Sequence, residues 1–151
     1  MPIDPADLFD LQRFVQAQES AYTAAFDELR AGHKRTHWMW FIFPQLRGLG
    51  SSPTSLFYGI TSVEEARAYL QHATLGPRLD SCTESVLAIE DKSLRQVFGS
   101  PDDRKFWSSM TLFSMAAGQS ASVYSRTLDR FFEGRRDPGT LALFTTTPDD
   151  P

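Results

Sequence analysis

The sequence of 151 residues contains a single cysteine, Cys82. One cysteine cannot form an intrachain disulfide, and it cannot supply a cysteine-based zinc site. The run Trp38–Phe43 holds six large apolar side chains, far short of the roughly 20 residues that a membrane-spanning helix needs. The N-terminus also lacks the basic flank and apolar segment of a secretory signal. We therefore expect a cytoplasmic protein in a reducing compartment, with no membrane partner.

Standard catalytic and nucleotide-binding motifs are missing from the sequence as well: it contains no P-loop, GxGxxG, HExxH or GxSxG. His33 and His37 are four residues apart, yet no third ligand is evident nearby, so we expect neither a metal nor a cofactor. Acidic residues also outnumber basic ones, so that the net charge is −4 and the pI is near 5.3. This charge argues against a nucleic-acid partner.

Aromatic residues, by contrast, are abundant, at 13% of the chain with twelve phenylalanines. The run Trp38–Phe43 alternates with neither the period of a helix nor that of a strand, so it should be covered on nearly every side. It is consistent with a short buried helix or with a buried strand. Residues 46–59 hold three glycines and several serines and prolines, which predicts a long ordered loop.

Most of the remaining sequence shows the spacing of amphipathic helices. Apolar residues predict a helix capped by Asp10 and ended by Gly32, and Gln18 lies on its apolar face. Either a break near Glu19–Ser20 turns Gln18 to solvent, or its amide points into a polar pocket. Further helix starts are predicted after Thr61 and at Ser100-Pro101-Asp102-Asp103, where serine is the cap and proline the first helical residue.

These signals predict a mainly α fold: a single multihelical domain of six to eight short helices, with at most a minor strand pair near 38–60. Residues 10–144 form the domain. Residues 1–9 are expected to be a loose N-terminal lead-in, and residues 145–151 a frayed polar tail.

Ring surfaces, cations and amides occur together around the aromatic run, a combination that suits a nucleotide-like or other small anionic ligand. A simpler explanation is open for each residue: tryptophans are more often core than platform, and small hydroxyls can serve close helix packing. The candidate ligand-binding residues are Gln18, Lys34, Trp38, Trp40, Gln45, Tyr58, Arg78, Lys105, Ser108 and Ser109.

If the protein is an enzyme, His37 is the first acid–base candidate, because imidazole titrates nearest neutral pH. We expect its ring to face a polar cavity at the start of the aromatic run, and Glu65 is the second catalytic candidate. The alternative is a protein-interaction module without catalytic activity, in which exposed rings form the contact surface. The oligomeric state is not predicted.

Several segments resemble an uncharacterised bacterial family, the domain of unknown function 1810, whose members are sometimes labelled calpastatin. They are DLQRFVQAQ at 10–18, THWMWFIFPQLRGLG at 36–50, LFYGI at 56–60, EARAYLQHATLGPRL at 65–79, VFGSPDDRKFWSSMTLF at 97–113 and DPGTLALF at 137–144. The resemblance spans about residues 8–144 and implies a mainly α-helical fold without an established activity. The calpastatin label does not suit this chain, because a disordered inhibitor would not carry so many aromatic residues.

The segment EEARAYL, with the Leu-Gly-Pro-Arg break that follows it, more weakly resembles small helical N-glycosidases. Those enzymes act on riboflavin-pathway and ADP-ribose compounds. This resemblance implies an N-glycosidase-like hydrolysis that uses a glutamate and aromatic residues. The glutamate-histidine-tyrosine signature of those enzymes is missing here, because Thr36-His37-Trp38 occupies its place.

Overall fold

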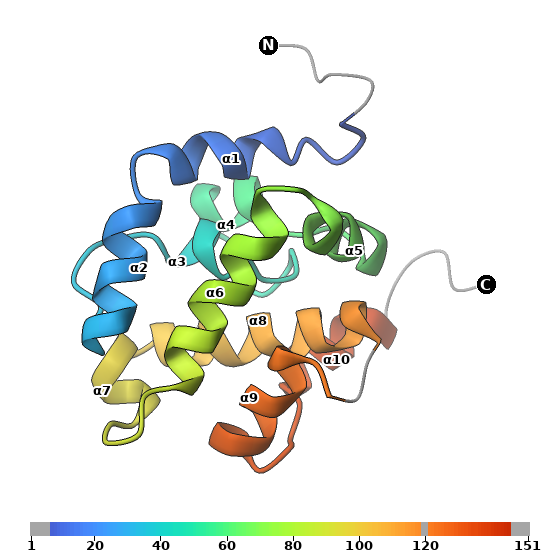
Figure 1. The fold of residues 1–151 in the computed structure, drawn as a ribbon. Helices are drawn as coiled ribbons and strands as arrows, with labels where there is room; N and C mark the ends of the chain where they lie inside the picture. The colour runs from blue at the N-terminus through green and yellow to red at the C-terminus, as the bar shows by residue number, and fades with distance from the viewer. Residues whose placement is uncertain (1–6, 119–120, 146–151) are drawn as a thin grey trace.

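The computed structural model describes residues 7–118 and 121–145, which form ten helices (Figure 1). In chain order these are α1 (Gln12–Glu19), α2 (Tyr22–Ala31), α3 (Met39–Ile42), α4 (Pro53–Tyr58), α5 (Val63–Gln71), α6 (Leu75–Leu87), α7 (Leu94–Phe98), α8 (Asp102–Ala117), α9 (Val123–Phe132) and α10 (Pro138–Thr145). Within these ranges the structure has no β-strand, only an isolated parallel bridge between Leu46 and Ile60. The mainly α prediction is confirmed, but six to eight helices was too low a number.

One reason for the low number is a break in the first predicted helix. Helix α1 ends at Glu19 and α2 begins at Tyr22, so the chain does break where the sequence suggested. The break does not turn Gln18 to solvent, because that side chain is only 1% exposed.

The start of α1 also differs from the prediction. The Asp7 carboxylate accepts the backbone N–H groups of Leu11 and Gln12 at 2.8 and 2.9 Å, so the capping carboxylate is that of Asp7 and not of Asp10. The predicted stop at Gly32 is confirmed: its φ is +74°, and its N–H bonds back into the last turn of α2.

The second reason is α4, which lies inside the predicted loop 46–59. Ser52 caps this helix by accepting the N–H of Ser55, and Pro53 occupies the first helical position. Serine followed by proline is a start signal that the sequence contains, and the surrounding glycines concealed it. The aromatic run is helical as well, because Met39–Ile42 forms α3.

Helix α8 begins one residue later than predicted. Its N-cap is Pro101, with no side-chain cap hydrogen bond, so Ser100 is not the cap. Asp102 and Asp103 do lie in the first turn, and Gly118 ends the helix in the left-handed conformation. In Figure 1, α6 crosses the front of the molecule while α8 runs across its lower half and contacts α3, α5, α7, α9 and α10.

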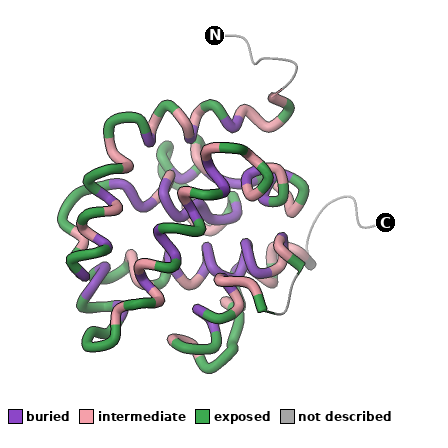
Figure 2. Tube along the Cα trace, in the orientation of Figure 1, coloured by how far each residue is buried: buried purple, intermediate pink, exposed green. Residues whose placement is uncertain are grey.

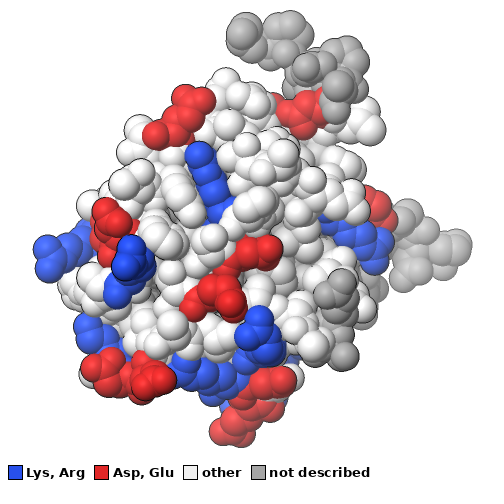
Figure 3. Space-filling model, viewed as in Figure 1, with Lys and Arg blue, Asp and Glu red and all other residues white. Residues whose placement is uncertain are grey.

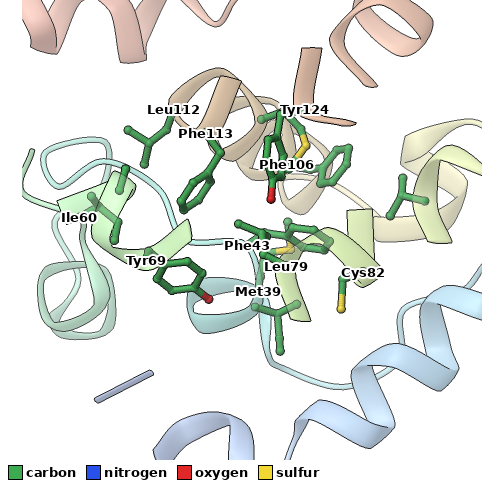
Figure 4. Packing of buried hydrophobic residues seen from close by; sticks show 14 of the residues in the cluster. Met39, Phe43, Ile60, Tyr69, Leu79, Cys82, Phe106, Leu112, Phe113 and Tyr124 are labelled. Atoms are coloured by element: carbon green, nitrogen blue, oxygen red, sulfur yellow. The ribbon is translucent and has the colours of Figure 1, made fainter. Parts of the chain in front are cut away.

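The core is a single cluster of buried side chains in which aromatic rings pack both edge to face and stacked. Phe106 of α8 lies 4.9 Å from both Phe43 and Phe98, measured between ring centroids, edge to face with the first and stacked with the second. Figure 2 shows buried backbone concentrated along α8 and the inner segments, and Figure 4 shows Phe43, Phe106, Phe113 and Tyr124 converging. Aromatic side chains supply large apolar areas, which explains how short helices share one core.

The aromatic run is covered only in part. Trp38, Met39, Ile42 and Phe43 are buried, but Trp40 and Phe41 are half-buried. The run therefore contributes to the core and also reaches the surface, where part of the Trp40 and Phe41 side chains is exposed.

Most of the predicted lead-in and tail lies outside the described residues, which exclude 1–6 and 146–151. Among the helices that are described, none combines the length and the apolar character needed to cross a membrane.

The backbones of α5 and α6 lie so close together at Gly76 that a larger residue there should destabilise the fold. A Cβ at Gly76 would lie 2.1 Å from the backbone oxygen of Leu70, and backbone cannot move aside as a flexible side chain can. Gly76→Ala should lower the free energy of unfolding by about 3 kcal/mol, measured by urea denaturation. The control is Gly118→Ala, which meets no atom within 4 Å and has φ +66°; it should cost about 1 kcal/mol. Equal costs for both variants would contradict the predicted clash.

Candidate functional site

Two lysines and one carboxylate meet beside the aromatic run. Asp102, in the first turn of α8, has its carboxylate 3.0 Å from Lys34 Nζ and 3.2 Å from Lys105 Nζ. Lys34 Nζ also lies 5.1 Å from the ring centroid of Trp38. Lys105 Nζ lies 4.5 Å from that of Trp40. These five residues are called the lysine–tryptophan cluster, and its two ammonium groups share one carboxylate.

The two halves of this cluster differ in exposure. Trp38 is 1% exposed and the Lys34 side chain 7%. The Lys105 side chain is 25% exposed, and Trp40 is half-buried. Lys105 and Trp40 therefore form the accessible part, and Lys34 contributes charge from beneath the surface.

A glycine in the loop before α4 allows close approach to the Trp40 ring. A Cβ at Gly50 would lie 3.0 Å from Ser55 Oγ and 3.4 Å from Trp40 Cη2. Any larger residue would have to displace one of these groups, so Gly50 places the loop against the edge of the indole ring.

The turn that carries Lys34 toward Asp102 is held by Glu28 of α2. The Glu28 carboxylate accepts the backbone N–H groups of Arg35 and Thr36, the Thr36 hydroxyl and the Trp38 indole N–H, at 2.7 to 3.0 Å. Burial raises the pKa of Glu28, but these hydrogen bonds lower it more strongly, to about 2. The charged carboxylate thus fixes the entry to the aromatic run.

Two of the candidate residues carry a buried polar atom that has no hydrogen-bond partner in the described residues: Gln45 Nε2 and Ser109 Oγ. Gln45 is 3% exposed and Ser109 is fully buried. Ser109 follows Lys105 by four residues, so the two lie on the same face of α8. An unpaired buried polar group is costly and needs an explanation, such as a water molecule or a ligand group.

Gln18 and Arg78 belong to a second cluster, behind the aromatic run. Gln18 Nε2 donates to the Phe41 carbonyl at 2.8 Å and to the Tyr69 hydroxyl at 3.1 Å, and Gln18 Oε1 accepts from Arg78 at 3.2 Å. The Arg78 guanidinium lies 4.7 Å from the ring centroid of Tyr22. Burial raises the pKa of the Tyr69 phenol. The Gln18 amide is therefore satisfied within the protein.

Glu65 lies in a third cluster, where both its oxygens are engaged. Oε2 is 2.8 Å from the Arg13 guanidinium, and Oε1 accepts the backbone N–H and the hydroxyl of Thr61. The residue is 2% exposed, so these contacts account for Glu65 without any chemistry. Nearby, Tyr58 packs on the Phe14 and Phe41 rings.

Ser108 does not join Ser109 as an unpaired hydroxyl. Its Oγ lies 2.6 Å from Asp137 Oδ2, which also accepts the hydroxyl of Thr140 at 2.7 Å. This contact ties α8 to the start of α10 and explains the serine structurally.

The expected position of His37 is wrong. Its side chain is exposed and does not face a buried polar cavity, because the turn held by Glu28 directs the chain inward only from Trp38 onward. His33 is exposed too. The described residues contain no group of three or more His, Cys, Asp or Glu side chains placed to hold a metal ion.

The sequence prediction missed other residues and cavities. Asp102 was taken for a helix-start acid, although Lys105 three residues later was a local signal for pairing. Four cavities are described, and their lining residues include neither Trp40 nor Lys105. The lysine–tryptophan cluster is thus a surface site, whereas the largest of these cavities is lined by Arg67, Asp80, Tyr124 and other residues that were not singled out.

Comparisons with known proteins place the chain among uncharacterised proteins. Residues 8–144 match the model of a family described as "Protein of unknown function (DUF1810)". The fold is similar to that in the crystal structure of the conserved hypothetical protein Rv1873 from Mycobacterium tuberculosis, with 52% identity and a TM-score of 0.88 over 95% of this chain and 100% of that chain. A search of curated proteins gave no match. The resemblance inferred from the sequence segments is confirmed.

The lowered pKa of Glu28 predicts a pH-dependent contribution to stability. A depressed carboxyl pKa stabilises the fold fully above the ordinary value of 4.5, and this contribution is lost as the pH falls toward about 2. Glu28→Gln should therefore cost about 2 kcal/mol at pH 7, and its difference from wild type should shrink between pH 4.5 and 2. Urea unfolding across that range measures both, with the exposed Glu19→Gln as control. A difference that is constant with pH would show that the Glu28 charge does not hold the turn.

Proposed function

The chain belongs to the family DUF1810, a family of unknown function, and from its geometry we propose that it binds a small anionic, nucleotide-like ligand at the lysine–tryptophan cluster. The observation that carries this proposal is the sharing of Asp102 by Lys34 and Lys105, with Lys105 Nζ 4.5 Å from the Trp40 ring centroid. The site thus combines two ammonium groups, which share the carboxylate of Asp102, with a half-buried indole.

The accessible half of the cluster suits the two parts of such a ligand. The Lys105 ammonium is a compact charge of the kind that binds phosphate groups. The Trp40 ring offers apolar area to a flat ring, and stacking of a base on an aromatic side chain is worth about 1–3 kcal/mol. A nucleotide carries both a phosphate and a flat ring, so it can use both contacts.

The unpaired Gln45 amide and Ser109 hydroxyl support the same proposal. Both are buried, neither has a partner in the described residues, and Ser109 lies one turn after Lys105 on α8. A polar ligand group, or a water molecule bound to it, would supply the missing hydrogen bonds. Such contacts would add specificity to the charge of Lys105.

We do not extend the proposal to N-glycosidase-like hydrolysis. That chemistry needs a carboxyl group beside the glycosidic bond, and both oxygens of Glu65 are engaged by Arg13 and Thr61. Asp102 is the carboxylate of the cluster, and its two oxygens are likewise engaged, Oδ2 by Lys34 and Oδ1 by Lys105.

ADP-ribose is a suitable probe, because it combines two phosphates with an adenine ring. Lys105→Ala should weaken its binding about tenfold or more and reduce the salt dependence of the affinity, measured by isothermal titration at low and high salt. The control is Arg104→Ala, which removes the same charge from the neighbouring, exposed position of α8. Unchanged affinity of the Lys105 variant at both salt concentrations, or equal losses in both variants, would remove the cluster from the ligand site.

A second candidate function rests on an exposed apolar patch on another face. Its members are Leu8, Leu56 and Phe57, which are 81%, 44% and 54% exposed. Leu8 and Phe57 line a cavity of about 320 Å³ together with Asp10 and Arg47. Exposed apolar patches beside a cavity are typical of protein contact surfaces. Trp38 and Trp40 do not form this patch, contrary to the sequence expectation.

A second copy of the chain is the partner that fits this patch. A two-fold contact requires a surface that complements itself, and here exposed side chains adjoin a cavity that can receive them. Asp10 and Arg47 carry opposite charges at the same cavity without forming an ion pair with each other. Across a two-fold axis, Asp10 of each copy can face Arg47 of the other.

Sedimentation analysis over a range of concentrations tests the dimer. Phe57→Asp should shift the protein to monomer, because it buries a charge in the contact. Arg47→Asp should weaken the dimer, and Arg47→Asp combined with Asp10→Arg should restore it. A wild-type protein that remains monomeric up to the highest soluble concentration would rule out this candidate, and the control Arg104→Asp should leave the mass unchanged.

A further inference from the structure

The largest of the described cavities lies on the face shown in Figure 3, between α5, α6, α9 and the end of α8. Its volume is about 720 Å³, within the range of roughly 300–1,000 Å³ that is usual for small-molecule sites. Apolar side chains in its lining include Leu70, Ala116 and Val123. Polar and charged side chains line it as well, among them Arg67, Asp80, Glu84 and Arg126.

One wall of this cavity is acidic. Asp80 and Glu84 are four residues apart on α6 and therefore share a face, and Figure 3 shows acidic side chains at the centre of this view, over α6. The Tyr124 hydroxyl donates to Asp80. Burial raises the pKa of the Tyr124 phenol, so it stays protonated and holds that carboxylate in place.

The facing groups include two arginines, but only one is free of ion pairs. Arg126 lies 3.3 Å from Glu84, so these two charges cancel. Arg67 of α5 donates from Nε to the Ala116 carbonyl at 3.4 Å, and no carboxylate of the described residues lies within ion-pair distance of it. The charges left without an opposite partner are one cation, Arg67, and one anion, Asp80.

We infer that this cavity binds a zwitterion of the amino-acid type with an apolar side chain. Its carboxylate would pair with the Arg67 guanidinium, and its ammonium group with Asp80. The apolar side chain would lie against Leu70, Ala116 and Val123. Both residues are exposed, so a bound ligand can reach them; a zwitterion would contact both charges, whereas a simple anion or cation would contact one. This inference is independent of the lysine–tryptophan cluster.

Three related compounds test each charge on the unmodified protein. L-leucine carries both charges, N-acetyl-L-leucine lacks the ammonium charge, and L-leucinamide lacks the carboxylate. We expect saturable binding of L-leucine, seen as shifts of backbone amide signals in α5, α6 and α9 by NMR. Each blocked compound should bind at least tenfold more weakly.

Two substitutions then connect each ligand charge to one residue. Arg67→Gln should weaken L-leucine at least tenfold and leave L-leucinamide unaffected. Asp80→Asn should weaken L-leucine to the same degree and leave N-acetyl-L-leucine unaffected. Lys105→Ala should change none of these affinities, which distinguishes this cavity from the proposed nucleotide site.

Absence of L-leucine shifts up to tens of millimolar would overturn the inference. Equal binding of all three compounds would overturn it too, because neither charge would then be recognised. Should Asp80→Asn unfold through loss of its Tyr124 contact, the comparison of the three compounds on the wild-type protein decides alone.

Discussion

The geometry around the aromatic run depends on the hydrogen bonds accepted by the Glu28 carboxylate. Because it accepts from the backbone of Arg35 and Thr36 and from the Trp38 indole, it fixes both the turn after α2 and the first ring of the run. Hydrogen bonds to a charged acceptor are stronger than those between neutral groups. The buried position of Trp38 and the reach of Lys34 to Asp102 both follow from this turn, so a charge on α2 determines where one of the two cations of the lysine–tryptophan cluster lies.

Much of the helical pattern could be predicted from the sequence, because caps and glycine stops are local signals. Gly32 ends α2 as predicted, Gly118 ends α8 in the same left-handed conformation, and Ser62 caps α5. The errors arose where two local signals competed: Ser52-Pro53 starts α4 among loop residues, and Gly76-Pro77 lies in the first turn of α6, where proline is tolerated. Local patterns cannot decide between such signals without knowing what the segment packs against.

The candidate site was harder to predict because residue type does not reveal partners. Lys34, Trp38, Trp40 and Lys105 do come together around Asp102, and Ser109 is buried one turn after Lys105 on α8. Gln18 and Arg78 form a separate polar cluster with Tyr69, which is distant from Gln18 in sequence. Glu65 belongs to another cluster, where its partner is Arg13 of the distant helix α1. His37 shows the same principle: its apolar neighbours suggested burial, and a turn fixed by a residue nine positions earlier leaves it exposed.

The distribution of charge explains how an acidic protein can hold cationic sites. The net charge of −4 describes the field far from the molecule, whereas a bound group responds to charges within about a Debye length, roughly 8 Å in physiological salt. At that range, two lysines share one carboxylate at the start of α8, and Arg67 faces the α6 acids across a cavity. Glu84 cancels Arg126, so counting arginines in the cavity would overstate its positive charge. The pairing within each site, rather than the total, determines which ligand charge it can accept.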